Sequence, residues 1–386
     1  MKKIGIIGTG NISRSHIEGY LRFPAQCQIV ALVDIYPERA QALKEKYQLD
    51  AAVFSAHKDI LGQGLDLVSI CTPPYVHASI AIDCLEAGIN VLVEKPMATS
   101  LAECDAMIEA RDRSGKLLSV IAQNRFRTPI MKLKQTLDSG LAGRVLHAQI
   151  DSFWWRGHCY YDLWWRGTWE KEGGGCTLNH AVHHIDMLGW MMGRPQRVSA
   201  MISNANHDNS EVEDVSVAVL QYGGGALAQL TSSVIHHGEE QKLQFQCEHA
   251  KIAAPWQVIA ARSSGNGFPM PNEPLEQEIQ AFYDALPELV HCGHSGQILD
   301  VLTALETGGT PTIDGPQGRA TIELITAIYK AGTQRRAVDL PISPQDPFYS
   351  FQGILANVPR FHEKSGSVAA LTGEITVGSN YDYEHI

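Results

Sequence analysis

The sequence lacks the features that mark secreted and membrane-spanning proteins. No stretch approaches the roughly 20 apolar residues that cross a bilayer, and the apolar start from Met1 to Ile7 is too short for a signal peptide. The eight cysteines are scattered and contain no C-x-x-C pair, so neither a disulfide framework nor a zinc ribbon is indicated. We therefore expect a cytoplasmic protein whose thiols are reduced and mostly buried.

Positive charge is also scarce. Lysine and arginine number 31 against 42 acidic residues, which gives a formal net charge of -11 at pH 7, and no basic run reverses that sign locally. Such a field repels phosphate backbones, which argues against a nucleic-acid partner. The hydrophobic content of 44% and the length of 386 residues instead predict a folded chain with two domains, each with its own core.

Residues 1–122 alternate short β-branched runs with helical stretches. This alternation predicts an α/β domain of the Rossmann type, a doubly wound parallel sheet with helices on both faces. The expected strands are Lys3–Ile7, Ile29–Asp34, Ala52–Phe54, Leu67–Cys71, Asn90–Glu94 and Leu117–Ala122.

After about Gln123 the runs become longer and take a period of two, and Gly223-Gly224-Gly225 indicates a hairpin between two of them. Residues 123–342 are therefore expected to form an α+β domain with an open, mainly antiparallel sheet. The expected strands are Val145–Phe153, Arg197–Ile202, Val215–Gln221, Ala226–Val234 and Lys242–Cys247, and the later helices lie near 276–292, 296–307 and 318–331. Residues 343–386 are predicted to be an irregular extension, broken by prolines, whose aromatic residues favour packing on this subunit or a neighbouring one.

The first predicted strand runs into a glycine-rich turn at the start of a helix, Gly8-Thr9-Gly10-Asn11-Ile12-Ser13. Gly8 permits the tight turn, and Gly10 lets the backbone approach a pyrophosphate. Asn11 and Ile12 then open a helix whose unpaired N–H groups and dipole favour an anion. The turn therefore predicts a dinucleotide site, although glycines can also serve a tight turn alone.

Asp34 ends the second predicted strand, where a carboxylate accepts hydrogen bonds from a ribose 2′-hydroxyl. The same carboxylate repels a 2′-phosphate, and the neighbouring Ile35 and Tyr36 supply no neutralising cation. NAD is therefore the expected cofactor rather than NADP. Arg39, one helical turn further on, is the residue that weakens this preference.

The fourth and fifth predicted strands end in polar segments that reach the carboxyl edge of the sheet, where ligands bind in open α/β folds. Lys95, within Glu94-Lys95-Pro96, would project into the cofactor cleft and exchange protons near neutrality beside a positive nicotinamide ring. A salt bridge to a surface carboxylate is the commoner use of a lone lysine. Pro96 is a position where a cis peptide bond is expected. The residues expected to line the cofactor beyond the glycine turn and Asp34 are Ile35, Thr72, Pro73, His77, Glu94, Lys95 and Gln123.

These segments together resemble the Gfo/Idh/MocA oxidoreductase family. The resemblance rests on Gly8-x-Gly10, Thr72-Pro73-Pro74 with His77, Glu94-Lys95-Pro96, and Gly173-Gly174-Gly175 followed by His183 and Asp186, and it extends to about residue 340. It implies a second domain whose outer sheet face makes dimers or tetramers. It also implies oxidation or reduction of sugars, cyclitols, glycosides or nucleotide sugars.

The resemblance assigns a proton path to the segment after the triple glycine. The family there carries an aspartate and, four residues later, a histidine that takes the hydroxyl proton as hydride leaves. In this chain the two positions are Asn179 and His183. Because an amide cannot ionise, we expect His183 to carry the proton with Lys95 assisting, while Asn179 orients a substrate hydroxyl.

Five of the seven tryptophans fall within residues 154–169, together with two tyrosines and two arginines. Flat aromatic faces beside polar groups suit a polyhydroxylated ring, although packing in the core or between subunits is as common a use. By resemblance, Trp165 and Arg166 match a pair near the cofactor, and Tyr161 faces the substrate. Arg156 would suit a substrate carboxylate.

His180 and His184, spaced i, i+4, are the one pattern that suggests a metal. No matching third ligand is evident and NAD alone accepts the hydride, so we predict no metal. Lys95 and His183, contributed by separate domains, are expected to act on one nicotinamide ring.

Two other functions use the same fold. An enzyme that retains its NAD would oxidise a sugar carbon transiently and eliminate a glycosidic bond. A dinucleotide or sugar sensor would instead control a partner protein, but it has no need of a proton path. Reversible hydride transfer between NAD and a secondary alcohol is therefore the leading hypothesis.

Overall fold

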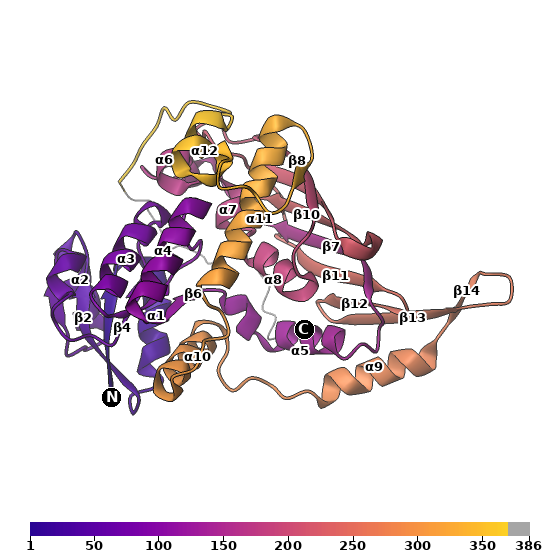
Figure 1. Ribbon diagram of the computed structural model, residues 1–386, viewed down its shortest axis with the longest axis horizontal. Coiled ribbons are helices and arrows are strands. Elements are labelled where there is room, and N and C mark those ends of the chain that lie inside the picture. Colours follow the sequence, from indigo (N-terminus) through magenta and orange to yellow (C-terminus); the bar gives the residue numbers. More distant parts are fainter. Residues whose placement is uncertain (370–386) are drawn as a thin grey trace. The chain divides into compact units, whose positions relative to one another are not determined.

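The computed structural model describes residues 1–369, which belong to two compact units (Figure 1). Unit 1 contains Met1–Phe126, Val290–Ile322 and Pro344–Leu355, and unit 2 contains Arg127–Leu289, Glu323–Ser343 and the described part of the segment from Ala356 onward. The limits predicted from the sequence treat each domain as one continuous stretch. The units instead are each assembled from separate segments.

Unit 1 is built on a sheet of six parallel strands in the order β3-β2-β1-β4-β5-β6. Its centre consists of branched side chains such as Ile4, Ile6 and Leu67, which are fully buried, as expected for a sheet covered on both faces. This confirms the doubly wound prediction. The strands are β1 (Lys2–Ile7), β2 (Cys27–Val33), β3 (Ala52–Phe54), β4 (Leu67–Ile70), β5 (Asn90–Val93) and β6 (Leu118–Val120).

The helices of unit 1 pack in pairs, α1 against α10 and α3 against α4 (Figure 1). Helix α4 shows how the sequence sets its ends: the Ser100 hydroxyl accepts from the backbone N–H of Glu103, and Gly115 ends the helix at φ 64°. The bounds are α1 (Asn11–Leu21), α2 (Pro37–Lys46), α3 (His77–Glu86), α4 (Leu101–Ser114) and α10 (Gly293–Thr307). Helices α11 (Gly315–Gln334) and α12 (Phe351–Asn357) begin in unit 1.

Unit 2 is built on a nine-stranded sheet in the order β14-β13-β12-β11-β7-β10-β9-β8-β15. Its pairs are antiparallel except β10 with β7. The predicted hairpin at Gly223-Gly224-Gly225 joins β9 to β10, with φ of 74° and 87° at the last two glycines. The strands are β7 (Val145–Phe153), β8 (Arg197–Ser203), β9 (Val215–Gln221), β10 (Leu227–Ser233), β11 (Gln241–Cys247), β12 (Ala250–Ala254), β13 (Gln257–Ser263), β14 (Pro269–Pro271) and β15 (Val338–Asp339).

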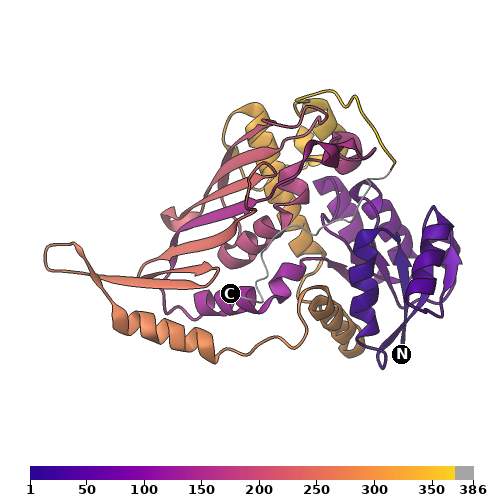
Figure 2. The same ribbon diagram turned by 180° about the vertical axis from the view of Figure 1, so that it is seen from behind.

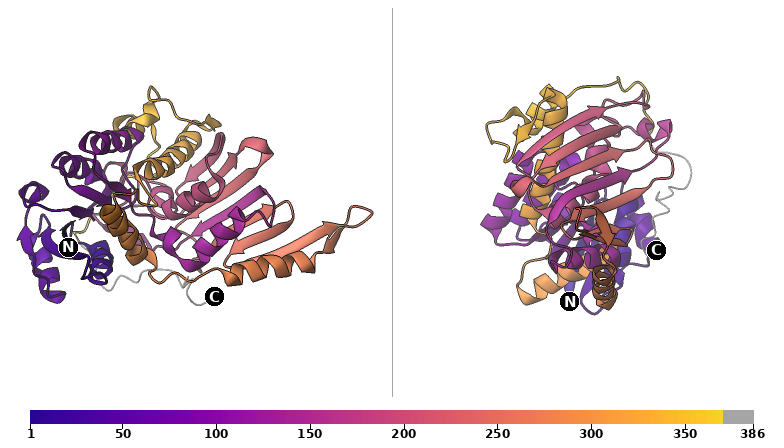
Figure 3. Two further views of the ribbon diagram at one scale, coloured as in Figure 1. Left: turned by 60° about the horizontal axis from the view of Figure 1, so that its bottom comes forward. Right: turned by 90° about the vertical axis from the view of Figure 1, so that its right-hand side faces the viewer.

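Helices of the same unit cover one face of this sheet. The other face of the sheet is turned toward the viewer in the right-hand view of Figure 3. Strands β13 and β14 extend as a hairpin with α9 alongside (Figure 2). The helices are α5 (Thr128–Asp138), α6 (Trp169–Glu172), α7 (Cys176–Asn179), α8 (Val182–Met192) and α9 (Glu273–Ala285).

Three expectations about secondary structure need correction. The helix predicted to reach Cys292 ends at Ala285, because the residue before Pro287 is pushed into an extended conformation. The extension predicted to be irregular contains α12, a helix short enough to fit between Pro347 and Pro359. Strands β12 to β15 were not expected, since short or exposed strands carry little period-two signal. The part of the extension after residue 369 lies outside the described residues.

All eight cysteines are free thiols, and six of them are buried, as the sequence predicted. Among the described helices, none is long and apolar enough to cross a membrane.

Candidate active site

The glycine turn of unit 1 has the geometry that a dinucleotide needs. Gly8 lies at φ 90°, and a Cβ added to it would come within 2.7 Å of the Cys71 carbonyl oxygen, so only glycine fits. A Cβ added to Gly10 would meet no atom within 4 Å. Ser13 is fully buried and its hydroxyl donates to the Gly10 carbonyl (2.6 Å). The backbone at Gly10, with Asn11 and Ile12 opening α1, therefore offers the open approach expected for a pyrophosphate.

Asp34 follows β2 and accepts three hydrogen bonds from its own surroundings. One oxygen accepts from the backbone N–H (2.8 Å) and the hydroxyl (2.7 Å) of Thr9, and the other accepts from the backbone N–H of Tyr36 (2.9 Å). A carboxylate offers about four acceptor positions, so the second oxygen retains capacity for a ribose hydroxyl. Ile35 is 76% exposed, and the Arg39 guanidinium stacks on the Tyr36 ring, 4.3 Å from its centre.

Two further predicted cofactor residues have shielded oxygens that make no hydrogen bond within residues 1–369. They are the Thr72 hydroxyl, after β4, and the side-chain oxygen of Gln123, after β6. Both follow strands of the same parallel sheet at its carboxyl edge. Because buried polar atoms normally have partners, these oxygens fit a polar ligand such as the dinucleotide.

His77 lies at the start of α3, fully buried, between two loops of that sheet edge. Its Nε2 is 2.8 Å from the Thr72 carbonyl and its Nδ1 is 2.9 Å from the Pro96 carbonyl. Burial lowers the pKa of His77, against the hydrogen bonds to the two carbonyls. A neutral imidazole has one N–H group and donates to one of these carbonyls at a time, and donation through Nδ1 to Pro96 ties the start of α3 to the loop that contains Lys95.

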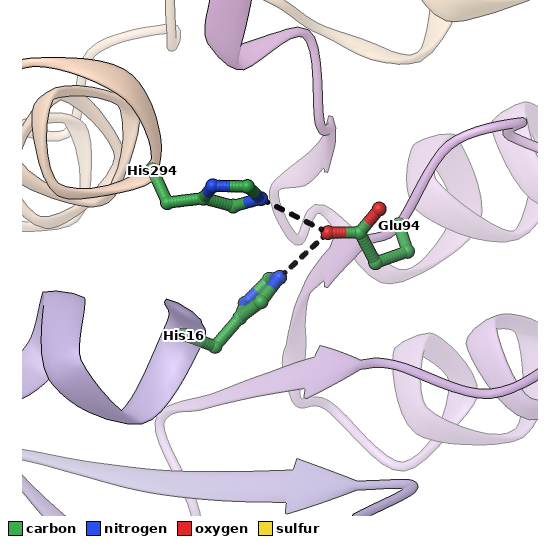
Figure 4. A group of neighbouring side chains, drawn as sticks. All are labelled: His16, Glu94 and His294. Atoms are coloured by element: carbon green, nitrogen blue, oxygen red, sulfur yellow. Dashed lines mark hydrogen bonds and ion pairs between the residues drawn. The ribbon is translucent and has the colours of Figure 1, made fainter. Parts of the chain in front are cut away.

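Glu94 precedes Lys95 and receives hydrogen bonds from two histidines (Figure 4). One carboxylate oxygen is 2.8 Å from His16 Nε2 and 3.3 Å from His294 Nε2, and the other accepts from the backbone N–H of Lys95 (3.1 Å). His16 lies on α1 and His294 on α10. The triad therefore joins two helices to the end of β5, and it holds the backbone at Lys95. The Lys95–Pro96 bond is cis, as expected.

The hydrogen-bond network assigns the protons of this triad. Burial alone would raise the pKa of Glu94, but the hydrogen bonds from His16 and His294 outweigh it and hold that pKa well below its usual range. Burial lowers the pKa of His16 despite the same contact. A neutral His16 donates through Nε2 to Glu94, and its Nδ1 accepts from the Ser69 hydroxyl (3.0 Å), which is 2.8 Å from Tyr20 Oη.

Within residues 1–369, His16, Glu94 and His294 are also the group of three side chains whose ligand atoms lie close enough to hold a metal. Two imidazoles and a carboxylate are a ligand set that Zn²⁺ accepts. Their ligand atoms already hydrogen-bond one another, however, so we interpret the group as a support for Lys95. His180 and His184 belong to no such group within the described residues.

In unit 2, Asn179 ends α7 and His183 is the second residue of α8. The Asn179 amide donates to the carbonyls of Gly174 (2.8 Å) and Gly175 (3.3 Å), so it holds the triple-glycine loop as well as being a candidate for substrate binding. Both Asn179 and His183 are partly exposed. His184, by contrast, is fully buried, and burial lowers its pKa to about 4.

A buried acidic side chain, Glu213, anchors the same loop from the segment just before β9. It accepts from the backbone N–H groups of Gly175 and Thr177 and from the Tyr329 hydroxyl, each at 3.0 Å. A Cβ on Gly175 would lie 1.9 Å from the Glu213 carbonyl, which explains the glycine. Burial raises the pKa of Glu213 to about 7, against the hydrogen bonds that favour its charged form.

Glu213 predicts a pH-dependent stability. Its pKa is about 7 in the folded chain against 4.5 ordinarily, so the folded state binds the proton more tightly and the stabilisation is complete below pH 4.5. It is lost as the pH rises to about 7, by up to about 3 kcal/mol. We expect Glu213→Gln to remove this dependence in urea unfolding measured from pH 5 to 8.

The comparison with wild type at each pH isolates Glu213, because His184, whose folded pKa is about 4, acts in the opposite direction in both proteins. The Glu213→Gln chain should therefore gain stability relative to wild type as the pH rises. Parallel pH profiles for the two proteins would contradict the assignment.

The aromatic loop, defined as residues 154–169, holds a cluster centred on Tyr160. The Arg166 guanidinium lies 4.1 Å from the centres of both the Tyr160 and the Trp165 rings, and the Tyr160 hydroxyl is 3.3 Å from His180 Nε2. Glu172 orients Arg166 through a 2.7 Å ion pair. Tyr161, predicted to face the substrate, is only 1% exposed, whereas its neighbour Tyr160 is partly exposed. The predicted roles of Tyr161, Trp165 and Arg166 stay predictions.

Sequence reasoning missed the supporting residues. His16 and His294 are separated from Glu94 by 78 and 200 positions, and no local pattern connects them. Glu213 was visible only as an acidic residue before a predicted strand. Glu172, adjacent to the triple glycine, offered a weak signal because buried carboxylates require partners.

Comparison with known proteins agrees with this geometry. Residues 2–122 match the family described as oxidoreductase, NAD-binding Rossmann fold, and residues 130–253 match the GFO/IDH/MocA C-terminal domain. Myo-inositol 2-dehydrogenase of Thermotoga maritima is 24% identical over 88% of this chain and 98% of its own. A 1-carboxy-3-chloro-3,4-dihydroxycyclohexa-1,5-diene dehydrogenase of Comamonas testosteroni is 29% identical over 82% of this chain and 97% of its own.

Among solved structures, the WlbA dehydrogenase of Bordetella pertussis, in complex with NADH and UDP-GlcNAcA, is similar with a TM-score of 0.75. It is 28% identical, and the match covers 88% of this chain and 99% of that chain. The two family matches together span more than half of the sequence and include the glycine turn, Asp34, Lys95 and His183. The chain is therefore an NAD-dependent oxidoreductase that belongs to the GFO/IDH/MocA family.

Proposed function

We propose that this enzyme transfers hydride between NAD and a secondary alcohol carbon of a sugar, cyclitol or glycoside. The observation that carries the proposal is the presence of two proton-bearing side chains, Lys95 beside the anchored Glu94 and the partly exposed His183 at the start of α8. The relative named myo-inositol 2-dehydrogenase and the dehydrogenase solved in complex with NADH and UDP-GlcNAcA support this substrate class.

Each group has one task in the proposed reaction. Bound NAD supplies the hydride acceptor. His183 takes the proton of the substrate hydroxyl, while the Lys95 ammonium stabilises the negative charge that develops on the same oxygen. Asn179 holds a neighbouring hydroxyl by hydrogen bonding, and its amide N–H group donates to the glycine loop. In the reverse direction His183 returns the proton.

The aromatic loop is the proposed substrate-recognition element. The Arg166 guanidinium lies over the rings of both Tyr160 and Trp165. Aromatic faces bind the C–H faces of sugars, and arginine binds hydroxyl or carboxylate oxygens. Arg166 is held by Glu172 (2.7 Å). It is therefore oriented before a substrate arrives.

The direct test is a panel of sugars, cyclitols, glycosides and nucleotide sugars, each supplied with NAD while absorbance is followed at the NADH band. We expect at least one compound to produce NADH in proportion to the ketone formed. Release of an aglycone without net NADH would replace the proposal by oxidation and elimination. Tight NADH binding with no turnover of any compound would indicate a sensor.

Cofactor choice gives a second test. Replacing Asp34 by serine removes the carboxylate that repels a 2′-phosphate and accepts ribose hydroxyls, so we expect the ratio of Kd values for NADPH and NADH to shift at least tenfold toward NADPH. Fluorescence titration with both nucleotides measures it. Asp50→Ser, at an exposed position of the same unit, is the control and should leave the ratio unchanged; equal ratios in all three proteins would remove Asp34 from the site.

We also propose that the enzyme is a homo-oligomer joined through the uncovered face of the nine-stranded sheet. Met201, Val217 and Val219 point to this face and are 78%, 47% and 48% exposed. An apolar patch of this kind is unusual on a monomer. Val217→Glu is expected to convert the oligomer to monomers in light scattering, whereas Val290→Glu, at an 88% exposed position of unit 1, should not; an unchanged mass for Val217→Glu would contradict this interface.

The eight free thiols favour a reducing compartment, and we propose a cytoplasmic location on that ground.

A further inference from the structure

The C-terminal extension contacts the aromatic loop, and the contacts lie within unit 2. We propose that residues 359–368, here called the strap, fix the conformation of the aromatic loop and thereby set which substrates the enzyme accepts. The selectivity part rests on the proposed function, in which this loop recognises the substrate. The match to relatives covers 98–99% of their length with only 88% of this chain, so this chain carries residues beyond what they have.

Backbone pairing makes the first connection. The Val368 N–H donates to the Asp162 carbonyl (2.7 Å), and the Trp164 N–H donates to the Val368 carbonyl (3.0 Å). These two bonds form a parallel bridge between Leu163 and Val368. The bridge lies where a short 3-10 helix (His158–Asp162) ends, so the strap supplies backbone hydrogen bonds to the centre of the aromatic loop.

Asn209 makes the second connection because its amide binds both segments. Its Oδ1 accepts from the backbone N–H groups of Ser365 (2.8 Å) and Gly366 (2.9 Å). Its Nδ2 donates to the Asp162 carboxylate (2.8 Å) and the Gly366 carbonyl (3.1 Å). One side chain thus satisfies three backbone groups of the strap and one side chain of the loop.

Two further contacts hold the middle of the loop and its C-terminal end. The Lys364 ammonium donates to the Tyr161 carbonyl, and the indole N–H of fully buried Trp169 donates to the Pro359 carbonyl (2.9 Å). Tyr161 is next to Tyr160 in the chain, and Trp164 is next to Trp165. Tyr160 and Trp165 carry the rings of the proposed recognition element. Displacement of the strap should therefore change the positions of those rings.

If the strap only stabilised unit 2 as a whole, removing any of its contacts would have the same effect on the aromatic loop. An ion pair of the strap outside residues 160–166 therefore provides a control. Arg360 pairs with Glu211 (2.7 Å) with its side chain 57% exposed. Exposed pairs of this kind contribute little, and this one does not contact residues 160–166. Glu211 also accepts from the backbone N–H of Trp169, at the end of the loop, through its other carboxylate oxygen (3.3 Å), and Arg360→Gln leaves that carboxylate in place. Arg360→Gln is therefore a matched control that removes a strap cation and leaves residues 160–166 with their contacts.

The experiment uses the full chain carrying Asn209→Ala, Lys364→Met or Arg360→Gln. Hydrogen exchange is measured at the backbone amide of Trp164. Only variants whose thermal midpoint equals that of wild type are compared, which excludes global unfolding as the cause of faster exchange. We expect exchange at least tenfold faster in the first two variants and unchanged in the control. Unchanged exchange in both Asn209→Ala and Lys364→Met would overturn the strap; if Asn209→Ala fails to fold, Lys364→Met decides alone.

Selectivity is measured with the compound from the substrate panel that has the highest kcat/KM. We expect KM to rise at least tenfold in the two loop-releasing variants, with the Kd of NADH within about twofold of wild type. Faster exchange with an unchanged KM would overturn the role in selectivity. If no compound in the panel is turned over by wild type, the proposed function and the selectivity role both fall, while exchange at Trp164 still decides whether the strap holds the loop.

Discussion

His183→Ala is expected to lower kcat by about 10²–10⁴-fold, the range that loss of a general base produces, while the Kd for NADH stays within about twofold of wild type. The reason is that His183 is assigned the substrate proton alone: Asn179 cannot ionise, and no carboxylate stands in its place. Steady-state kinetics and NADH fluorescence measure the two quantities separately.

A matched control separates chemistry from folding. His249 is an exposed histidine of the same unit, in the turn between β11 and β12, so His249→Ala should leave both quantities unchanged. His183→Asn keeps hydrogen bonding without a titratable group and should be as slow as His183→Ala. Turnover near that of wild type in either His183 variant would remove this residue from the mechanism.

Lys95→Met is expected to cost at least 100-fold in kcat, because an apolar side chain of similar length cannot stabilise the charge that develops on the substrate oxygen. Folding should be little affected, since the backbone at this position is held by Glu94 and that carboxylate keeps its bonds to His16 and His294. The loss should therefore appear in kcat, with an unchanged thermal midpoint.

Lys95→Arg and Lys58→Met complete the test. Arginine retains a positive charge but is a poor proton donor. The Lys95→Arg enzyme should therefore have a higher kcat than Lys95→Met only if Lys95 acts through its charge and not as a proton donor. The Lys58 side chain is 72% exposed and its ammonium lies 3.8 Å from the Asp83 carboxylate, a long contact, so Lys58→Met should behave as wild type. A Lys95→Met enzyme with normal kcat would show that this lysine is a surface cation and nothing more.

The supporting groups behind the two proposed residues differ in how they act. Glu94 is ionised and held by two imidazoles, whereas burial raises the pKa of Glu213 to about 7. The first carboxylate therefore fixes the loop at Lys95 over a wide pH range. The second titrates near neutrality, so the glycine loop before Asn179 is the part of unit 2 whose stability should depend on pH.

The sequence by itself determined the features that arise within short segments. Alternation of strands and helices predicted the six-stranded parallel sheet, Gly8 and Gly10 predicted the turn, and Glu94-Lys95-Pro96 identified the sheet edge, because periodicity and backbone constraints are local. The same locality explains the errors: β12 to β15 carry weak patterns, and the prolines of the tail predict an irregular segment although α12 fits between two of them.

Only the tertiary structure decided which distant residues support the site. His294 meets Glu94 across 200 positions, Tyr329 reaches Glu213 across 116, and Gly366 binds Asn209 across 157. Hydrogen bonds of this kind depend on how α10, α11 and the strap pack in the folded chain. A periodic sequence pattern predicts that a residue is buried, but it does not predict which residue it contacts. The partners of buried polar groups are therefore a property of the folded chain.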